Sequence, residues 1–168
     1  MLGVGCVTPS TPGQGAAFAQ TKTAPKVAFP QENNDSPMPR VVHSLREWKK
    51  RMPPETFTVT RQAGTEAPYK NRYFDLHDAG TFQCAGCGLN LFTSDTKFDS
   101  GTGWPSFYAP IAKNRITEHR DVSLGTVRVE TVCARCDSHL GHVFDDGPKP
   151  TGLRYCMNSA ALVFAPKK

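Results

Sequence analysis

The residues of this chain best suited to chemistry are its cysteines, four of which form two C-x-x-C pairs. The pairs join Cys84 with Cys87 and Cys133 with Cys136. Zinc favours tetrahedral coordination by thiolates, and two such pairs are typical of a structural zinc site. A redox-active C-x-x-C or a set of disulfides is the alternative, which a single pair would favour more than two pairs do. We therefore predict one structural Zn²⁺ ion on these four residues.

Cys156 is the cysteine that remains in the part of the chain rich in large apolar residues. Arg154 and Asn158 lie two residues to either side of it, so on a β-strand all three side chains would share one face. A nearby guanidinium stabilises the thiolate, which is the nucleophilic form of cysteine. The sequence therefore indicates a reactive thiol, while a buried cysteine of the core is the alternative.

Two histidines follow the second cysteine pair at close spacing. His139 and His142 are three residues apart, and Asp146 follows them. Histidine is the side chain best suited to donate a proton near neutral pH, and a carboxylate can orient it. The alternatives are that one of these histidines replaces a cysteine on the metal or caps a loop.

A glycine-rich loop surrounds a tryptophan in the stretch 97–107. Gly101, Gly103 and Pro105 flank Trp104, which indicates a shaped loop that presents an aromatic wall. Such a wall suits a small apolar group such as a methyl. Packing of Trp104 in the core is the alternative.

The elements that must position these residues are mostly short strands. Ser44 and Glu47 fit a capping box at the start of a helix that ends before Pro53, and a short helical turn is expected over 54–57. Runs rich in β-branched and aromatic residues predict strands at 73–77, 81–84, 126–132 and 160–164. We therefore predict a mainly β fold with a short N-terminal helical segment. The cysteine pairs are too far apart for a compact zinc ribbon, so the metal would join distant parts of one domain.

The first forty residues differ in composition from the rest, being rich in Pro, Gly, Ser, Thr, Ala and Gln. They predict a disordered N-terminal tail, followed by one domain over 41–168. Ala17-Phe18-Ala19 resembles a signal-peptidase site, but no Lys or Arg precedes it. An ordinary secretory signal is therefore not expected unless the true start lies upstream, and export stays an open alternative to the favoured cytoplasmic location.

The net charge of +5 is spread along the chain, with Lys49-Lys50-Arg51 as its one basic run. Aromatic residues do not alternate with basic ones, so we expect no nucleic-acid partner. No apolar run approaches the roughly 18 residues of a transmembrane helix, so we expect a soluble protein without a membrane partner.

Taken together, these segments resemble the methionine-R-sulfoxide reductases of the B type, a family that repairs oxidised methionine in proteins. The resemblance covers about Ser44 to Phe164. It rests on the two cysteine pairs together with the segments Ser100–Phe107, His139–Phe144, Asp146–Pro148 and Arg154–Ala160.

The resemblance implies two antiparallel β-sheets, a structural zinc on the paired cysteines, and catalysis at Cys156. Trp104 and Phe107 are then expected to bind the substrate. The residues implied to surround the sulfoxide are His139, His142, Asp146, Arg154 and Asn158. A zinc-stabilised binding module without catalysis is the alternative function.

In the implied reaction, the Cys156 thiolate attacks the sulfoxide sulfur while His142, with His139, protonates its oxygen. Methionine leaves, and Cys156 becomes a sulfenic acid that a second thiol must reduce. Members of the family with an internal resolving cysteine often carry it where this chain has Thr102. Thioredoxin or another external thiol is therefore the expected reductant, and Cys6 is interpreted as an incidental thiol of the tail.

Overall fold

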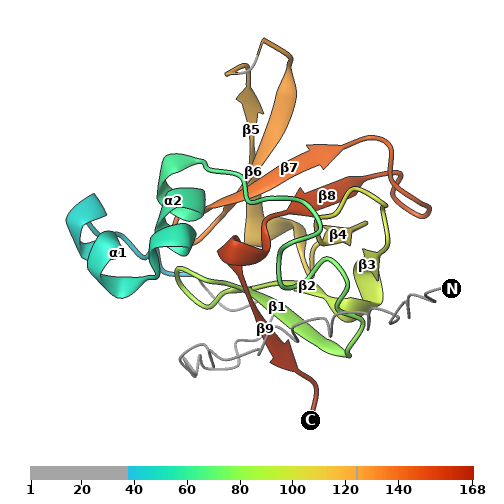
Figure 1. Ribbon diagram of the computed structural model, residues 1–168, viewed down its shortest axis with the longest axis horizontal. Helices are drawn as coiled ribbons and strands as arrows, with labels where there is room; N and C mark the ends of the chain where they lie inside the picture. Colours follow the sequence, from blue (N-terminus) through green and yellow to red (C-terminus); the bar gives the residue numbers. More distant parts are fainter. Residues whose placement is uncertain (1–37, 124) are drawn as a thin grey trace, which may run out of the picture.

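A computed structural model describes residues 38–123 and 125–168 (Figure 1). Most of the predicted tail, including Cys6, lies outside the described residues, so its disorder and the domain boundary after residue 40 stay predictions. No helix within the described ranges is long and apolar enough to cross a membrane.

Two short helices precede the sheets. Helix α1 (Leu45–Arg51) begins at Ser44, whose side chain accepts a hydrogen bond from the Glu47 backbone in the predicted capping box. Helix α2 (Pro54–Gln62) has proline in its first turn and ends at Ala63 in the left-handed conformation. This helix is longer than the turn expected over 54–57. Val59 is buried against the rest of the protein, and this packing outweighs the low helix propensity of the β-branched residues in the segment.

The smaller sheet has three antiparallel strands in the order β2-β1-β9. They are β1 (Gly80–Cys84), β2 (Asn90–Thr93) and β9 (Leu162–Pro166). The predicted strand at 73–77 is wrong: this segment forms turns, and Tyr73 packs edge-on against Phe82 beside the sheet. Its aromatic residues reflect burial rather than strand pairing.

The larger sheet is antiparallel with the order β3-β4-β8-β7-β6-β5. Its strands are β3 (Lys97–Phe98), β4 (Ser106–Phe107), β5 (Ile116–Asp121), β6 (Arg128–Cys133), β7 (His139–Phe144) and β8 (Arg154–Met157). Short 3-10 helices are η1 (Ser94–Thr96), η2 (Lys113–Arg115) and η3 (Ser159–Ala161). The β5–β6 hairpin extends beyond the rest of the sheet, at the top of Figure 1. The predicted fold of two antiparallel sheets with a helical preface is confirmed.

Aromatic side chains fill the core and connect the two sheets. Phe82 of β1 and Phe92 of β2 contact Phe107 of β4, with ring centroids 4.9 and 4.4 Å apart. All three side chains are fully buried. Burial of rings of this size dominates the packing free energy. The core therefore holds the two sheets together and leaves the other face of the larger sheet free to carry the site.

Candidate active site and metal centre

The four paired cysteines converge at one point where the two sheets meet. Their sulfur atoms all lie within 4.8 Å of one another. The Sγ atoms of Cys84 and Cys136 are 3.7 Å apart, and those of Cys87 and Cys133 are 3.6 Å apart. Tetrahedral zinc with bonds of about 2.3 Å requires sulfurs about 3.8 Å apart. The cluster can therefore hold a metal ion, and its geometry is compatible with zinc.

Tight turns after β1 and β6 make this convergence possible. The backbone N–H of Gly88 donates to the Cys84 carbonyl, and that of Asp137 donates to the Cys133 carbonyl, at 2.8 and 2.9 Å. Both residues at these turns have a positive φ, 75° for Gly88 and 54° for Asp137. Each turn thus brings the second cysteine of a pair back beside the first.

Cys156 lies on the face of the larger sheet that points away from the aromatic core. It stands directly opposite Ser106 of β4 on one side and His142 of β7 on the other, and His142 stands opposite Glu130 of β6. Opposite residues of antiparallel strands project to the same face. Strand register therefore places a thiol, a histidine and a carboxylate in one row.

Hydroxyl groups surround the Cys156 sulfur. Thr102 Oγ1 lies 3.9 Å from Cys156 Sγ, and Ser100 Oγ connects Thr102 to Ser106 at 2.8 and 2.7 Å. Burial raises the pKa of Cys156, while Thr102 and then Arg154 oppose that shift. The thiol is therefore held mostly protonated until local charge or hydrogen bonding favours the thiolate.

A cavity of ≈ 130 Å³ opens beside Cys156. Its lining comprises Thr65, Trp104, Arg128, Gly141, His142, Phe144, Cys156, Met157 and Asn158. The Trp104 indole N–H donates to the Glu66 carbonyl at 3.1 Å, which fixes the ring at the cavity wall. Phe107 lies in the core instead, because adjacent residues of β4 project to opposite faces.

Each histidine of the predicted pair has its own carboxylate partner. His142 Nε2 lies 2.8 Å from Asp121 Oδ2, and His139 Nδ1 lies 2.6 Å from Glu130 Oε1. Burial lowers the pKa of His139, against the opposing effect of Glu130. His142 lines both the cavity beside Cys156 and the neighbouring one, whereas His139 lines only the neighbouring one.

The other predicted site residues hold the edges of the site. The partner of Asp146 is Arg154 and not a histidine. Its carboxylate accepts two hydrogen bonds from the Arg154 guanidinium, at 2.7 and 2.8 Å. The Arg154 guanidinium also stacks on Phe144, 4.3 Å from the ring centroid. Asn158 is buried, and its amide donates to the Leu140 carbonyl and accepts from the Glu66 backbone, both at 3.1 Å.

Sequence reasoning missed four polar residues of this region. They are Asp121 and Glu130 on the histidines, Arg128, which donates to Asp121 at 2.6 Å, and Glu66, whose carboxylate accepts from the Ala160 backbone at 2.8 Å. Alternation in the 126–132 run did place Arg128 and Glu130 on one face. That signal identifies a polar face without saying that the face lines a site.

Alkylation of Cys156 by iodoacetamide should reveal its raised pKa. Because the thiolate is the reactive form and burial raises the pKa, the rate should keep rising with pH beyond the usual midpoint of about 8.5. Thr102→Val should move the midpoint higher, since it removes a hydroxyl that favours the thiolate. Thr102→Ser is the control that keeps the hydroxyl. The measurement uses a Cys6→Ser background, and a Cys156 midpoint at or below 8.5 would contradict the expectation.

Fold and site together define a class: a mainly β protein with a four-cysteine cluster and a separate cysteine beside a histidine on the face of an antiparallel sheet. Residues 52–166 match the SelR domain family. The chain is 54% identical over 127 residues to "Peptide methionine sulfoxide reductase MsrB" of Hahella chejuensis, covering 76% of this chain and 91% of that protein. It is 56% identical over 117 residues to the protein of the same name from Acinetobacter baylyi, covering 70% and 84%.

The chain therefore belongs to the methionine-R-sulfoxide reductase B (MsrB) family. It is a peptide-methionine (R)-S-oxide reductase, an oxidoreductase that reduces methionine sulfoxide. This confirms the resemblance seen in the sequence. The alternative function, a non-catalytic binding module, is therefore not needed to explain the zinc-type cysteine pairs.

Proposed function

We propose that the protein reduces the R epimer of methionine sulfoxide in peptides by thiol chemistry at Cys156. The observation that carries this proposal is the pairing of Cys156 with His142 across β8 and β7, at a cavity walled by Trp104. A thiol and a proton donor on one sheet face are what reduction of a sulfoxide requires. The Trp104 wall offers an apolar surface to the methyl group.

In the proposed reaction, the Cys156 thiolate attacks the sulfoxide sulfur and His142 supplies a proton to the oxygen. Asp121 accepts a hydrogen bond from His142 Nε2 at 2.8 Å, which orients the ring beside Cys156. The attack forms a bond between the Cys156 sulfur and the sulfoxide sulfur, and the S–O bond breaks as the protonated oxygen leaves. That oxygen, as hydroxide or water, then bonds to the Cys156 sulfur, the S–S bond breaks with its electron pair going to the departing methionine, and Cys156 is left as a sulfenic acid. His139 with Glu130, and Arg154 with Asp146, hold the two sides of the site in place.

Zinc has a structural role in this proposal. The ligands Cys84, Cys87, Cys133 and Cys136 would fill a tetrahedral shell, leaving no open position for a substrate. A metal in such a closed shell supplies folding free energy rather than chemistry. Cys156 is not among its ligands, so the two thiol chemistries stay separate.

The epimer preference tests the proposal directly. A walled cavity fixes which face of the sulfur meets Cys156, so pure protein with dithiothreitol should consume the R epimer of a methionine sulfoxide peptide and leave the S epimer. Chromatography of the two epimers measures this. Equal consumption of both epimers would contradict the proposed geometry, and consumption of neither would contradict the proposed function.

Recycling is proposed to depend on an external thiol such as thioredoxin, because Thr102, whose Oγ1 lies 3.9 Å from Cys156 Sγ, cannot form a disulfide. After one turnover without reductant, dimedone should label the Cys156 sulfenic acid. Thr102→Cys should instead form an internal disulfide, since its sulfur would replace an oxygen 3.9 Å from Cys156 Sγ and a small shift brings the sulfurs together.

Mass spectrometry distinguishes the two products, and Thr102→Ser is the matched control that should still be labelled. Cys6→Ser should change neither labelling nor turnover. A Cys6–Cys156 disulfide in the wild type, with thioredoxin-driven turnover lost in Cys6→Ser, would make the tail the source of the resolving thiol.

A further inference from the structure

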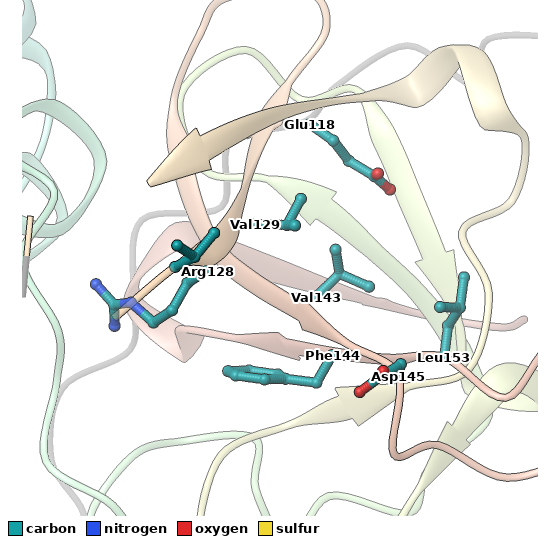
Figure 2. A pocket seen from close by; sticks show the side chains of 8 residues that line it. Glu118, Arg128, Val129, Val143, Phe144, Asp145 and Leu153 are labelled. Atoms are coloured by element: carbon teal, nitrogen blue, oxygen red, sulfur yellow. The ribbon is translucent and has the colours of Figure 1, made fainter. Parts of the chain in front are cut away.

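An apolar trough of ≈ 370 Å³ lies where β6 begins and β7 ends (Figure 2). Its lining comprises Glu118, Val127, Arg128, Val129, Val143, Phe144, Asp145 and Leu153. Val129 and Val143 stand opposite each other on β6 and β7, so their side chains share a face. They project to the opposite face of the sheet from Cys156, since neighbouring residues of a strand alternate.

The floor of the trough exposes apolar surface that burial would stabilise. Val127 is 66% exposed, and Val129 and Leu153 are only partly covered by the core. Figure 2 shows Val129, Val143 and Leu153 together, with the carboxylates of Glu118 and Asp145 at the border. A ligand that suits this surface has an apolar side chain and no negative charge beside it.

The trough and the catalytic cavity lie on opposite faces of the sheet and share two lining residues. Arg128 and Phe144 line both, and they lie at the end of the sheet that separates the two spaces. Arg154 stacks on the Phe144 ring and so holds it in place along this border. An extended chain with one side chain beside Cys156 would therefore cross the end of the sheet at Phe144 to place a neighbouring side chain in the trough.

The size of the catalytic cavity makes such a neighbouring surface necessary for a peptide. At ≈ 130 Å³ it has room for about one side chain, so the flanking residues must lie outside it. A second adjacent cavity, on the other side of His142, is lined by Asp121, Glu130 and His139. The polar groups there already pair with one another, as in the Asp121–His142 and Glu130–His139 contacts. Binding of an apolar side chain is therefore more favourable in the trough, where it removes apolar surface from water.

We propose that the apolar trough binds an apolar residue of the polypeptide substrate, close in sequence to the oxidised methionine. The inference rests on the proposed function of the catalytic cavity. It assigns substrate preference to a surface outside the reacting groups: segments with an apolar neighbour bind well, and acidic neighbours bind poorly because of Glu118 and Asp145. A single amino acid derivative does not reach the trough and is insensitive to it.

Matched peptides and variants test the trough. Peptides carry methionine R-sulfoxide with leucine or serine at one flanking position, on the N-terminal or the C-terminal side, and N-acetyl-methionine R-sulfoxide serves as the small substrate. The wild type should prefer leucine to serine on one side by about three- to tenfold in kcat/KM. Val127→Ser should remove most of that preference and leave the small substrate within about twofold of wild type.

Val122→Ser is the matched control, because Val122 is also an exposed valine of the β5–β6 hairpin but does not line the trough. It should keep the leucine preference. Equal rates for leucine and serine peptides in the wild type would overturn the inference, as would a preference that survives Val127→Ser or an equal loss on the small substrate.

Binding separates this inference from the proposed function. Cys156→Ser protein is expected to lose turnover, so fluorescence anisotropy of labelled peptides reports affinity alone. The leucine peptide should bind about three- to tenfold more tightly than the serine peptide. If the wild type reduces no substrate at all, the proposed function fails, and equal peptide affinities in this assay would independently overturn the trough.

Discussion

Replacement of Cys156 by serine should lower kcat/KM for methionine R-sulfoxide by at least about a thousandfold. A serine hydroxyl is hardly ionised near neutral pH, so it is a far weaker nucleophile than a thiolate. Serine also cannot accept the sulfoxide oxygen, because the product would be a high-energy hydroperoxide, whereas cysteine is oxidised to a sulfenic acid that a thiol can reduce. The measurement is steady-state reduction of N-acetyl-methionine R-sulfoxide with dithiothreitol.

The loss should come from chemistry and not from unfolding. Serine is close to cysteine in size. Its hydroxyl can hydrogen-bond to neighbouring hydroxyl groups such as that of Thr102. The unfolding temperature should therefore stay within a few degrees of wild type. Cys6→Ser is the control with the same substitution and should keep full activity. A Cys156→Ser protein within tenfold of wild type would show that another thiol attacks the sulfoxide.

The four-cysteine cluster and the fold class could be predicted because their signals are local. A C-x-x-C pair such as Cys84 and Cys87 indicates a metal or redox site within four residues of sequence. The Ser44–Glu47 capping box likewise indicates a helix start within four residues. Both cysteine pairs converge on one point, which confirms that they form a single cluster able to hold a metal ion. Such features depend little on how distant strands pair.

The partners of the histidines could not be predicted in this way. Asp121 reaches His142 because β5 pairs with β6 and β6 with β7 in one register, and no local pattern specifies that register. Arg128 and Glu130 alternate with valine and threonine as they would on a strand whose polar face meets water. Only the fold shows that this polar face borders the cavity of Cys156.

Neighbouring residues of one motif also separate in space. Trp104 and Phe107 belong to the same segment, yet Trp104 lines the cavity while Phe107 stacks on Phe92 in the core. In β4 the pleat sends Ser106 toward Cys156 and Phe107 away from it. A role for Phe107 in substrate binding is therefore a prediction that its buried position does not favour.

Loss of the metal should have an effect as large as loss of Cys156, but on the fold. The four thiolates connect the end of β1, in the smaller sheet, with the turn between β6 and β7 in the larger one. A structural zinc ion contributes roughly 10–16 kcal/mol of apparent binding free energy, which is comparable to the whole stability of a domain, about 5–15 kcal/mol. Cys136→Ser should therefore abolish cooperative folding, measured by circular dichroism and thermal unfolding.

The comparison of Cys136→Ser with Cys156→Ser makes this result specific, because both variants exchange one sulfur for one oxygen. Elemental analysis should find one zinc per chain in the wild type and in Cys156→Ser, and much less in Cys136→Ser. Chelation of the wild type should unfold the protein and abolish activity together, and zinc should restore both. A wild type without stoichiometric metal but with a stable fold would contradict the structural site. Activity that falls on chelation while the fold stays intact would instead give the metal a part in the reaction, contrary to the closed shell of four thiolates.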